Sequence, residues 1–473
     1  MELSDNVRTL CSRLSGHLFK TGIVFLVLLS IGGCASNERL YFAAPVLPLG
    51  TRPEMNTPGF WINLHPNPDK VVMSAEEIQL FNAYIRDELE SVKDISQYPP
   101  LYPGDYLRDS LEKSLRYIVK QRVYFPNGKR ARSDFFRRIE ANMNLAKIPA
   151  KVRIQFGLTV AYANQRILPT NQGLYAKKMN LDFDKLQNSA LDIATPLAIQ
   201  HVTADKKWVY AISPLSSGWI RAEKVAICSL MDLTYYMRAS PLAVVTSAKA
   251  DIFLDPTLRD YHARARMGAK FPCRVSKNQD VVEILIPSRL KDGSCMFIPA
   301  FVREPDIHKG YLSYTPRNVI LQAFKLLNAP YGWGGMYGEQ DCSRFIQEVF
   351  ATVGIMLPRN SSLQAKVGTL VATFNDESSE QDKIAILSDK AVYGISTLCM
   401  KGHIMLFLGL VNRCPYAIHA IWGYSQPHRR GDQTMVIKRA VVTNLRLGEE
   451  SERGSLLKRL KTVRIVDMNL PDT

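Results

Sequence analysis

The sequence predicts an α+β protein of several domains, and three observations support this fold class. At 473 residues the chain is too long for one hydrophobic core of ordinary size. Apolar residues recur at helical spacing near its start, whereas between Val152 and Glu304 they alternate with a period of two. In the last third, a helical pattern that opens with a cysteine precedes two strands that each carry a histidine.

The first module is predicted to be mostly helical. Ser74-Ala-Glu-Glu77 has the pattern of a capping box, and apolar residues follow it at intervals of three and four. Prolines between positions 99 and 103 interrupt the pattern before two more predicted helices, Tyr106 to Tyr124 and Ser133 to Leu145.

The middle of the chain is predicted to form small barrels. Leu197 to Val202, Trp208 to Ile212 and Gly218 to Ile220 read as short strands separated by tight turns. Strands of this length and spacing favour small closed sheets.

The N-terminus predicts export and lipid anchoring. Basic residues precede the apolar stretch Ile23 to Leu29, which is too short to span a bilayer and suits a signal peptide. It leads into Ile31-Gly-Gly-Cys34, which resembles a lipoprotein signal-peptidase box, so we expect Met1 to Gly33 to be removed and Cys34 to be lipidated. By resemblance to bacterial lipoproteins, Ala35 favours the outer membrane, facing the periplasm of the cell envelope. The alternative is a plain secretory signal with an incidental cysteine.

The net charge of +16 calls for an anionic partner or a solvated basic face. Local clusters include 129–132 and 137–138. No zinc-ligand spacing or base-stacking signature accompanies them, so nucleic acid is not expected as a partner. In an envelope protein, anionic glycan, acidic stem peptides or lipid headgroups are the expected counter-surfaces.

Of the eight cysteines, three fall in the signal peptide, the lipobox and the candidate active site, which leaves an odd number. An oxidising compartment would permit a bond between Cys273 and Cys295, or one between Cys399 and Cys414, although connectivity cannot be read from sequence. No Cys-x-x-Cys occurs, so a structural zinc site is not expected.

The candidate catalytic residues lie in the last third. Tyr331-Gly-Trp-Gly-Gly335 runs through a polar loop into Asp341-Cys342-Ser343 and an apolar-periodic helix. A cysteine in the first turn of a helix lies where unpaired N–H groups and the macrodipole stabilise a thiolate. His403 opens an alternating run about sixty residues later, and His419 follows on the next predicted strand. Each residue alone has an ordinary structural explanation; their order together favours catalysis.

This order resembles the NlpC/P60 family of papain-like cell-wall peptidases. The resemblance implies that Cys342 is the nucleophile, His403 the base, His419 its orienting residue and Tyr331 the tyrosine on the oxyanion side. Leu357-Pro-Arg-Asn-Ser-Ser362 follows the cysteine helix as in the family.

Three residues beside Cys342 bear on how a substrate would bind: Asp341, Ser343 and Arg344. In relatives that carry SH3 modules, the residues matching Asp341 and Ser343 are thought to contact the free amine of the stem peptide, whereas on general grounds Asp341 is the natural N-cap of the helix. Arg344 stands where the family usually has glycine, and it could reshape a subsite or point to solvent.

The resemblance extends upstream, because segments from Arg166 to Trp219 are similar to the bacterial SH3 module, and a second, more diverged barrel is expected from Ala248 to Glu304. The catalytic module is expected to begin with a helix from Asn318 to Leu327, and the acidic stretch from Asn375 to Lys390 reads as a surface loop. The predicted fold is thus α+β and multidomain, with a mostly helical N-terminal module, two small SH3-like β-barrels and a C-terminal papain-like NlpC/P60 domain. The expected segments are a signal peptide (1–33), a tether (34–55), the helical module (56–165), barrel one (166–247), barrel two (248–310) and the catalytic domain (311–467).

The resemblance implies a peptidoglycan hydrolase, a cysteine endopeptidase that cleaves the γ-D-glutamyl-diamino acid bond of stem peptides. A thiol beside an imidazole would give a thiolate and imidazolium pair, and the imidazolium then protonates the leaving amine. The main-chain N–H of Cys342 and the Tyr331 hydroxyl would hold the oxyanion, and no metal or cofactor is needed. The alternatives are a catalytically inactive wall-binding lipoprotein, or an amidase or acyltransferase on the same papain-like fold.

Overall fold

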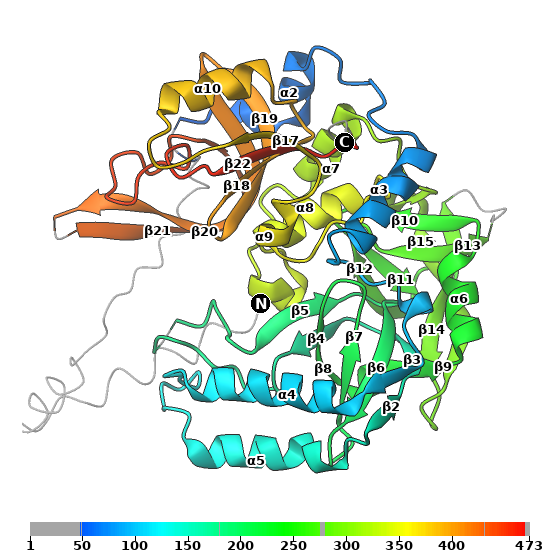
Figure 1. Cartoon of the computed structure of the whole chain (residues 1–473). Helices are drawn as coiled ribbons and strands as arrows, with labels where there is room; N and C mark the ends of the chain where they lie inside the picture. Colours follow the sequence, from blue (N-terminus) through cyan, green and yellow to red (C-terminus); the bar gives the residue numbers. More distant parts are fainter. Residues whose placement is uncertain (1–47, 49, 179, 275–279, 430, 469–473) are drawn as a thin grey trace, which may run out of the picture. The chain divides into compact units, whose positions relative to one another are not determined.

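The computed structural model of the chain describes residues 48, 50–178, 180–274, 280–429 and 431–468 (Figure 1). The predicted signal peptide, the lipidation site Cys34 and most of the tether lie outside the described residues. Inside them, every helix is too short or too polar to cross a membrane.

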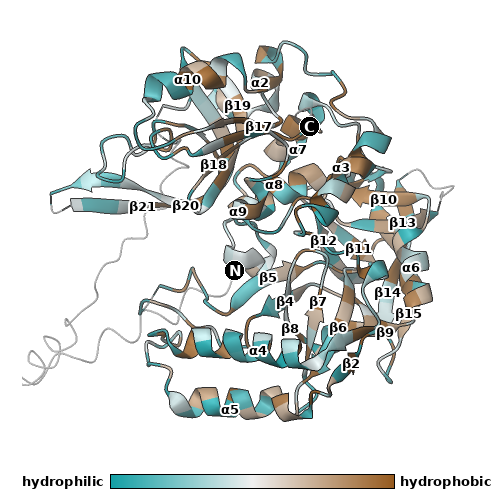
Figure 2. Ribbon diagram, viewed as in Figure 1, coloured by the Kyte–Doolittle hydropathy of each residue, from teal (hydrophilic) through white to brown (hydrophobic). Residues whose placement is uncertain are grey.

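The first 100 described residues are rich in helix, and the predicted capping box is confirmed. The Ser74 side chain accepts from the Glu77 N–H, and the Glu77 carboxylate accepts from the Ser74 N–H. Figure 2 shows polar and apolar residues interleaved along α4 and α5, as expected for helices with one buried face. The elements are α2 (Pro58–Leu64), α3 (Ala75–Asp87), β1 (Leu101–Pro103), α4 (Gly104–Val119), α5 (Ser133–Met143) and β2 (Lys151–Arg153).

These helices divide between two hydrophobic cores. Trp61 of α2 and Phe81 of α3 are buried in the core of the C-terminal module. Leu111 of α4 and Ile139 of α5 are buried in the core under the first large sheet, with Trp219 of that sheet. The helical segment therefore joins two modules rather than packing only on itself.

The first sheet has seven strands in the order β5-β4-β8-β7-β6-β3-β9. The three strands predicted between 197 and 220 are all present, and two further strands of this sheet begin before Arg166. Helix α6 (Leu230–Arg238) follows it. The strands are β3 (Gln155–Thr159), β4 (Ala163–Arg166), β5 (Gln187–Leu191), β6 (Pro196–Val202), β7 (Trp208–Ile212), β8 (Ser217–Arg221) and β9 (Val225–Cys228).

The second sheet also has seven strands, ordered β12-β11-β15-β14-β13-β10-β16, around a separate core. The turn between β14 and β15 reaches the edge strand β9 of the first sheet, where Ile227 forms a parallel bridge with Ser294. The strands are β10 (Leu242–Val245), β11 (Lys249–Phe253), β12 (Tyr261–Arg266), β13 (Lys270–Arg274), β14 (Val281–Arg289), β15 (Cys295–Arg303) and β16 (Ile307–Lys309).

The C-terminal module places helices against a six-stranded sheet ordered β17-β22-β18-β19-β20-β21. Helix α8 contacts strands β19 and β20, which carry the two predicted histidines. The predicted first helix is present as α7. The elements are α7 (Pro316–Lys325), η6 (Trp333–Gly338), α8 (Cys342–Ala351), α9 (Ser361–Gln364), β17 (Thr369–Thr373), α10 (Glu380–Asp389), β18 (Ser396–Met400), β19 (His403–Val411), β20 (Cys414–His428), β21 (Gly431–Asn444) and β22 (Thr462–Ile465).

The prediction of a surface loop from Asn375 to Lys390 is wrong, because most of this stretch forms α10. Ser379 caps this helix by accepting from the Asp382 N–H. Leu387 is completely buried, and Ile384 packs against the same cluster. A few apolar residues at helical spacing therefore outweigh the acidic composition that suggested a loop.

Neither of the two disulfide bonds that an oxidising compartment would permit is present, and all six described cysteines are free thiols. Cys273 is buried in the core of the second sheet, whereas Cys295 packs against the core of the first. Cys399 pairs with Ile404 at one end of β19, and Cys414 pairs with Val411 at its other end. At about 3.3 Å per residue, that separation far exceeds the reach of a disulfide bond.

Candidate active site

The predicted nucleophile is the first residue of α8. Asp341 caps this helix by accepting from the Arg344 N–H at 2.9 Å, which confirms the predicted N-cap. The Cys342 side chain is only 8% exposed. The main-chain N–H of Ile404 donates to the Cys342 sulfur, so the thiol lies against the start of β19, directly after His403.

The two histidines form a chain of hydrogen bonds that ends on a threonine. Nε2 of His403 lies 2.6 Å from Nδ1 of His419, and Nε2 of His419 lies 2.9 Å from the Thr443 hydroxyl. Thr443 pairs with Ala417 on the adjacent strand, two residues before His419, so both side chains stand on one face of the sheet. Sequence reasoning missed Thr443, because its contact depends on the register of β20 and β21.

Burial decides the protonation of these groups. Burial lowers the pKa of His403 to about 3, and burial together with His403 lowers the pKa of His419 well below its ordinary value. Burial, with the Asp341 charge in addition, raises the pKa of Cys342 to about 12. In the substrate-free site these shifts favour the neutral thiol and the neutral imidazoles, and the predicted ion pair stays a prediction.

Tyr331 lies within electrostatic reach of the nucleophile. Its main-chain N–H donates to the Lys438 carbonyl at 2.8 Å, which fixes the residue beside β21. Burial, followed by the Cys342 and Asp341 groups, raises the pKa of Tyr331 above its ordinary value. Its hydroxyl therefore stays protonated and can donate a hydrogen bond.

Arg359 holds both neighbours of the predicted nucleophile, Cys342. Its guanidinium forms a bidentate ion pair with the Asp341 carboxylate, with N–O distances of 2.8 and 3.1 Å. It also donates a hydrogen bond to the Ser343 hydroxyl at 3.0 Å. Its Nε donates to the hydroxyl of Ser189 on β5 at 3.0 Å. Asp341 is thus already paired with a cation, and its contact with a substrate amine stays a prediction. Arg359 lies within the motif noted after the cysteine helix, but its partners could not be read from the sequence.

Arg344 does not point to solvent, since it is only 9% exposed. It donates to Glu348 at 2.9 Å on its own helix and to Asp192 at 2.7 Å, just beyond β5. Arg266 of the second sheet pairs with the same Asp192 at 3.0 Å. Arg344 therefore joins α8 to both sheets.

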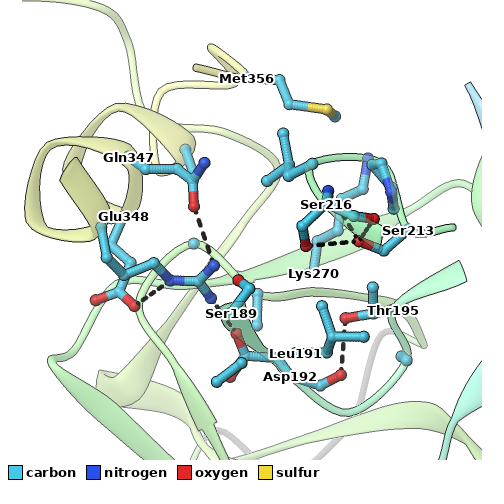
Figure 3. A pocket seen from close by; sticks show the side chains of 18 of the residues that line it. Ser189, Leu191, Asp192, Thr195, Ser213, Ser216, Lys270, Gln347, Glu348 and Met356 are labelled. Atoms are coloured by element: carbon cyan, nitrogen blue, oxygen red, sulfur yellow. Dashed lines mark hydrogen bonds and ion pairs between the residues drawn. The ribbon is translucent and has the colours of Figure 1, made fainter. Parts of the chain in front are cut away.

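This junction borders a pocket of about 190 Å³. Figure 3 shows Gln347 and Glu348 on one side of the pocket, with Asp192 and Leu191 on another. Met356 and Lys270 also line the pocket. The pocket lies where the three modules meet, and Cys342 is not among its lining residues.

The segment before β5 packs against the catalytic module. Asp182 accepts from the Trp422 indole at 2.9 Å and pairs with Lys438 at 2.8 Å. The ring of Phe183 lies 5.3 Å from that of Trp333 and 5.1 Å from that of Trp422. Since Trp422 is three residues after His419 on β20, these contacts fix the first sheet module beside the candidate catalytic residues.

The basic cluster predicted around 129–132 lines a second, open hollow of about 1090 Å³ beside α5. Phe125 and Phe135 pack edge to face there, with ring centroids 5.0 Å apart. The charge of this hollow is mainly positive and comes from Lys129, Arg130, Arg132 and Arg138, against Asp134.

Replacing Thr443 by valine should lower kcat roughly tenfold, the effect of about 1.4 kcal/mol from one lost hydrogen bond on a neutral group. Valine keeps the volume and shape of the side chain but removes the acceptor that fixes the His419 ring. Steady-state kinetics should show an unchanged KM, and Thr443→Ser should restore the rate. An equal loss of rate in the serine variant would contradict the positioning role.

Two family models and several solved structures match parts of this chain. Residues 328–393 match the model of the NlpC/P60 family, and residues 174–221 match the model of the SH3 domain of the SH3b1 type. The fold is similar to that of an NlpC/P60 endopeptidase from Photobacterium damselae subsp. piscicida, with a TM-score of 0.70 and 21% identity over 85% of this chain and 95% of that one. An NlpC/P60 family protein from Bacillus cereus ATCC 10987 matches with a TM-score of 0.42 and 15% identity over 60% of this chain and 83% of that one. No curated protein matches the chain significantly.

Proposed function

We propose that this chain, which carries an SH3 domain of the SH3b1 type followed by an NlpC/P60 domain, is a peptidoglycan-hydrolysing cysteine peptidase. The observation that carries the proposal is the chain of hydrogen bonds from His403 through His419 to Thr443, at the end of β19 against which the Cys342 thiol packs. We further propose that the two seven-stranded sheets are the two SH3-like barrels, and that the first forms a wall of the substrate cleft.

The proposed mechanism begins with the tautomers. If Nε2–H of His403 donates to His419, and Nε2–H of His419 donates to Thr443, then Nδ1 of His403 keeps a free lone pair. That nitrogen takes the Cys342 proton as the sulfur attacks the substrate carbonyl, so the ion pair forms during the reaction. The main-chain N–H of Cys342 and the Tyr331 hydroxyl stabilise the oxyanion.

The second half of the reaction returns the proton. The His403 imidazolium protonates the leaving amine, which leaves an acyl thioester on Cys342. His403 then removes a proton from water, which hydrolyses the thioester and restores the thiol. We propose that the scissile bond is the one between D-glutamate and the diamino acid of the stem peptide.

Digestion of purified peptidoglycan, with mass analysis of the fragments, tests this function. We expect fragments with a new amino terminus on the diamino acid and a new carboxyl terminus on D-glutamate. Release of whole stem peptides from muramic acid would indicate an amidase, and products formed only with an added amine acceptor would indicate an acyltransferase. Unchanged peptidoglycan would support the inactive wall-binding alternative.

Substrate amine recognition can be decided with two soluble peptides. Because Arg359 already neutralises Asp341, we expect a free L-Ala-γ-D-Glu-diamino acid peptide and its N-acetylated form to differ by less than about threefold in kcat/KM. A preference of tenfold or more for the free amine would assign Asp341 and Ser343 to substrate binding. An N-formylated peptide, which adds less bulk, controls for steric exclusion of the acetyl group.

We also propose that the protein is lipid-anchored in the cell envelope through Cys34, which places it with peptidoglycan as its partner. Metabolic labelling of cells that express the full-length chain, with a fatty acid, should mark the processed protein that begins at Cys34. Cys34→Ser should lose the label and leave the membrane fraction, since the acyl chains supply the membrane affinity. Membrane retention of the unlabelled Cys34→Ser variant would contradict the anchor, and Cys11→Ser serves as the control that keeps the label.

A further inference from the structure

Two cysteines lie opposite each other where the two sheets meet. The turn between β14 and β15 adds to the edge strand β9: the Ile227 N–H donates to the Gly293 carbonyl at 2.9 Å, and Ile227 and Ser294 form a parallel bridge. One residue further along both segments, this register places Cys228 opposite Cys295. Neighbouring strands lie about 4.8 Å apart, which is within the range of Cα separations of disulfides, about 4.4–6.8 Å.

The two side chains also share a direction. In a parallel pair, opposed residues project to the same face, and Cys228 and Cys295 both pack against the core under the first sheet. Burial, and then the Cys295 thiol, raise the pKa of Cys228 to about 12. Burial, and then Asp232, raise the pKa of Cys295 to about 11, and Asp232 acts on Cys228 as well. Each sulfur is therefore within electrostatic range of the same carboxylate, and Cys228 within range of the Cys295 thiol.

We propose that Cys228 and Cys295 form a disulfide bond that covalently ties the first sheet to the second. Both side chains are only partly buried, so an oxidant can reach them. The oxidant would be the disulfide of a thiol–disulfide oxidoreductase. One cysteine attacks that disulfide to give a mixed disulfide, and the other then displaces it, so the chain loses two hydrogen atoms and the oxidoreductase leaves as a dithiol.

The disulfide bond would hold the first and second sheets together. Asp192, just beyond β5, pairs with both Arg266 of the second sheet and Arg344 of α8, so this three-way ion network depends on the two sheets staying together. A bond between β9 and β15 would close a long loop of chain and restrict their separation in the unfolded ensemble.

A second pair of thiols is the main competitor. Cys399 lies within electrostatic reach of Cys342, and these side chains are 3% and 8% exposed. A bond between them would block the nucleophile, whereas a bond between Cys228 and Cys295 leaves it free. The two outcomes are therefore distinguished by peptide mapping, which shows which cysteines are joined.

The test is to incubate the purified full-length protein with oxidised glutathione and then map its peptides by mass spectrometry without reduction. We expect a cross-linked peptide that contains Cys228 and Cys295, the loss of two hydrogen atoms from the intact mass, and unchanged alkylation of Cys342 after denaturation. Addition of dithiothreitol should lower the melting midpoint by roughly 5 °C.

Matched variants make the result decisive. Cys228→Ser and Cys295→Ser should each abolish the cross-link and the effect of dithiothreitol on melting, whereas Cys273→Ser, on strand β13 of the second sheet, should keep both. Separate glutathione adducts on Cys228 and Cys295, or a cross-link that joins either of them to another cysteine, would overturn the proposal. Hydrolytic activity is not a readout, so failure here leaves the peptidase assignment untouched.

Discussion

Cys342→Ala should abolish hydrolysis of stem peptides, with a loss in kcat of at least about 10³-fold. Alanine cannot form the acyl thioester, and the carbonyl carbon then has only water as a nucleophile. The control is Cys399→Ala, which removes a sulfur of similar burial on the neighbouring strand β18 and should keep most of the activity.

Fragment analysis by mass spectrometry, with circular dichroism to confirm folding, measures both variants. Wall hydrolysis by a correctly folded Cys342→Ala protein would remove this residue from the mechanism. The raised pKa of Cys342 adds a second readout. Its alkylation by iodoacetamide should be slow at neutral pH and should accelerate as the pH rises towards about 12, because only the thiolate reacts.

Arg359→Met should be the most destabilising of the substitutions considered, at about 3–5 kcal/mol in the free energy of unfolding, because it leaves the Asp341 carboxylate buried without a cation. Hydrolysis should fall as well, since the flanking residues of the nucleophile lose their support. Urea denaturation followed by tryptophan fluorescence measures the first effect. Arg137→Met, which breaks an exposed ion pair with Asp134, is the matched control and should change stability little.

The pH dependence of that deficit gives a further check. Burial raises the pKa of Asp341, but the opposing charge and hydrogen bonds of Arg359 prevail and hold it below the ordinary value. A carboxylate with a lowered folded-state pKa stabilises the protein above its unfolded pKa of about 3.9, and this stabilisation is lost as the pH falls through the folded pKa. The difference between wild type and Arg359→Met should therefore be largest near pH 7 and shrink below pH 4. The double variant Asp341→Asn with Arg359→Met should recover part of the loss, and an additive double variant would contradict the pairing.

Local signals predicted much of this structure. The Ser74 capping box, the Asp341 N-cap and the strands from 197 to 220 depend on residues a few positions apart, and all are present. The acidic stretch that became α10 shows the opposite case, because the burial of Leu387 against a distant strand outweighs its local composition. A single sequence contains no direct sign of that packing.

The contacts that organise the candidate site could not be predicted from the sequence for the same reason. Arg344 meets Asp192 across 152 positions, and Arg359 meets Ser189 across 170. The cysteines at positions 228 and 295 become neighbours only through the register of an isolated bridge. The sequence shows which charged and sulfur-containing residues are present. Which of them become partners is decided by how the sheets pack against one another and against α8.

The division of the N-terminal helices between two cores has a consequence for how the protein is made. Trp61, fully buried, has its ring 5.4 Å from that of Tyr416 on β20, so one of the first described segments to be synthesised packs on one of the last. Until the ribosome has added the C-terminal strands, Trp61 and Phe81 have no core to enter, and contacts this distant in sequence form slowly. The apolar side chains of this early segment are then exposed, and prone to aggregation, through much of the synthesis. A chain assembled in this order brings Cys342, His403 and His419 together only when it is nearly complete, so any activity of the candidate site would begin late.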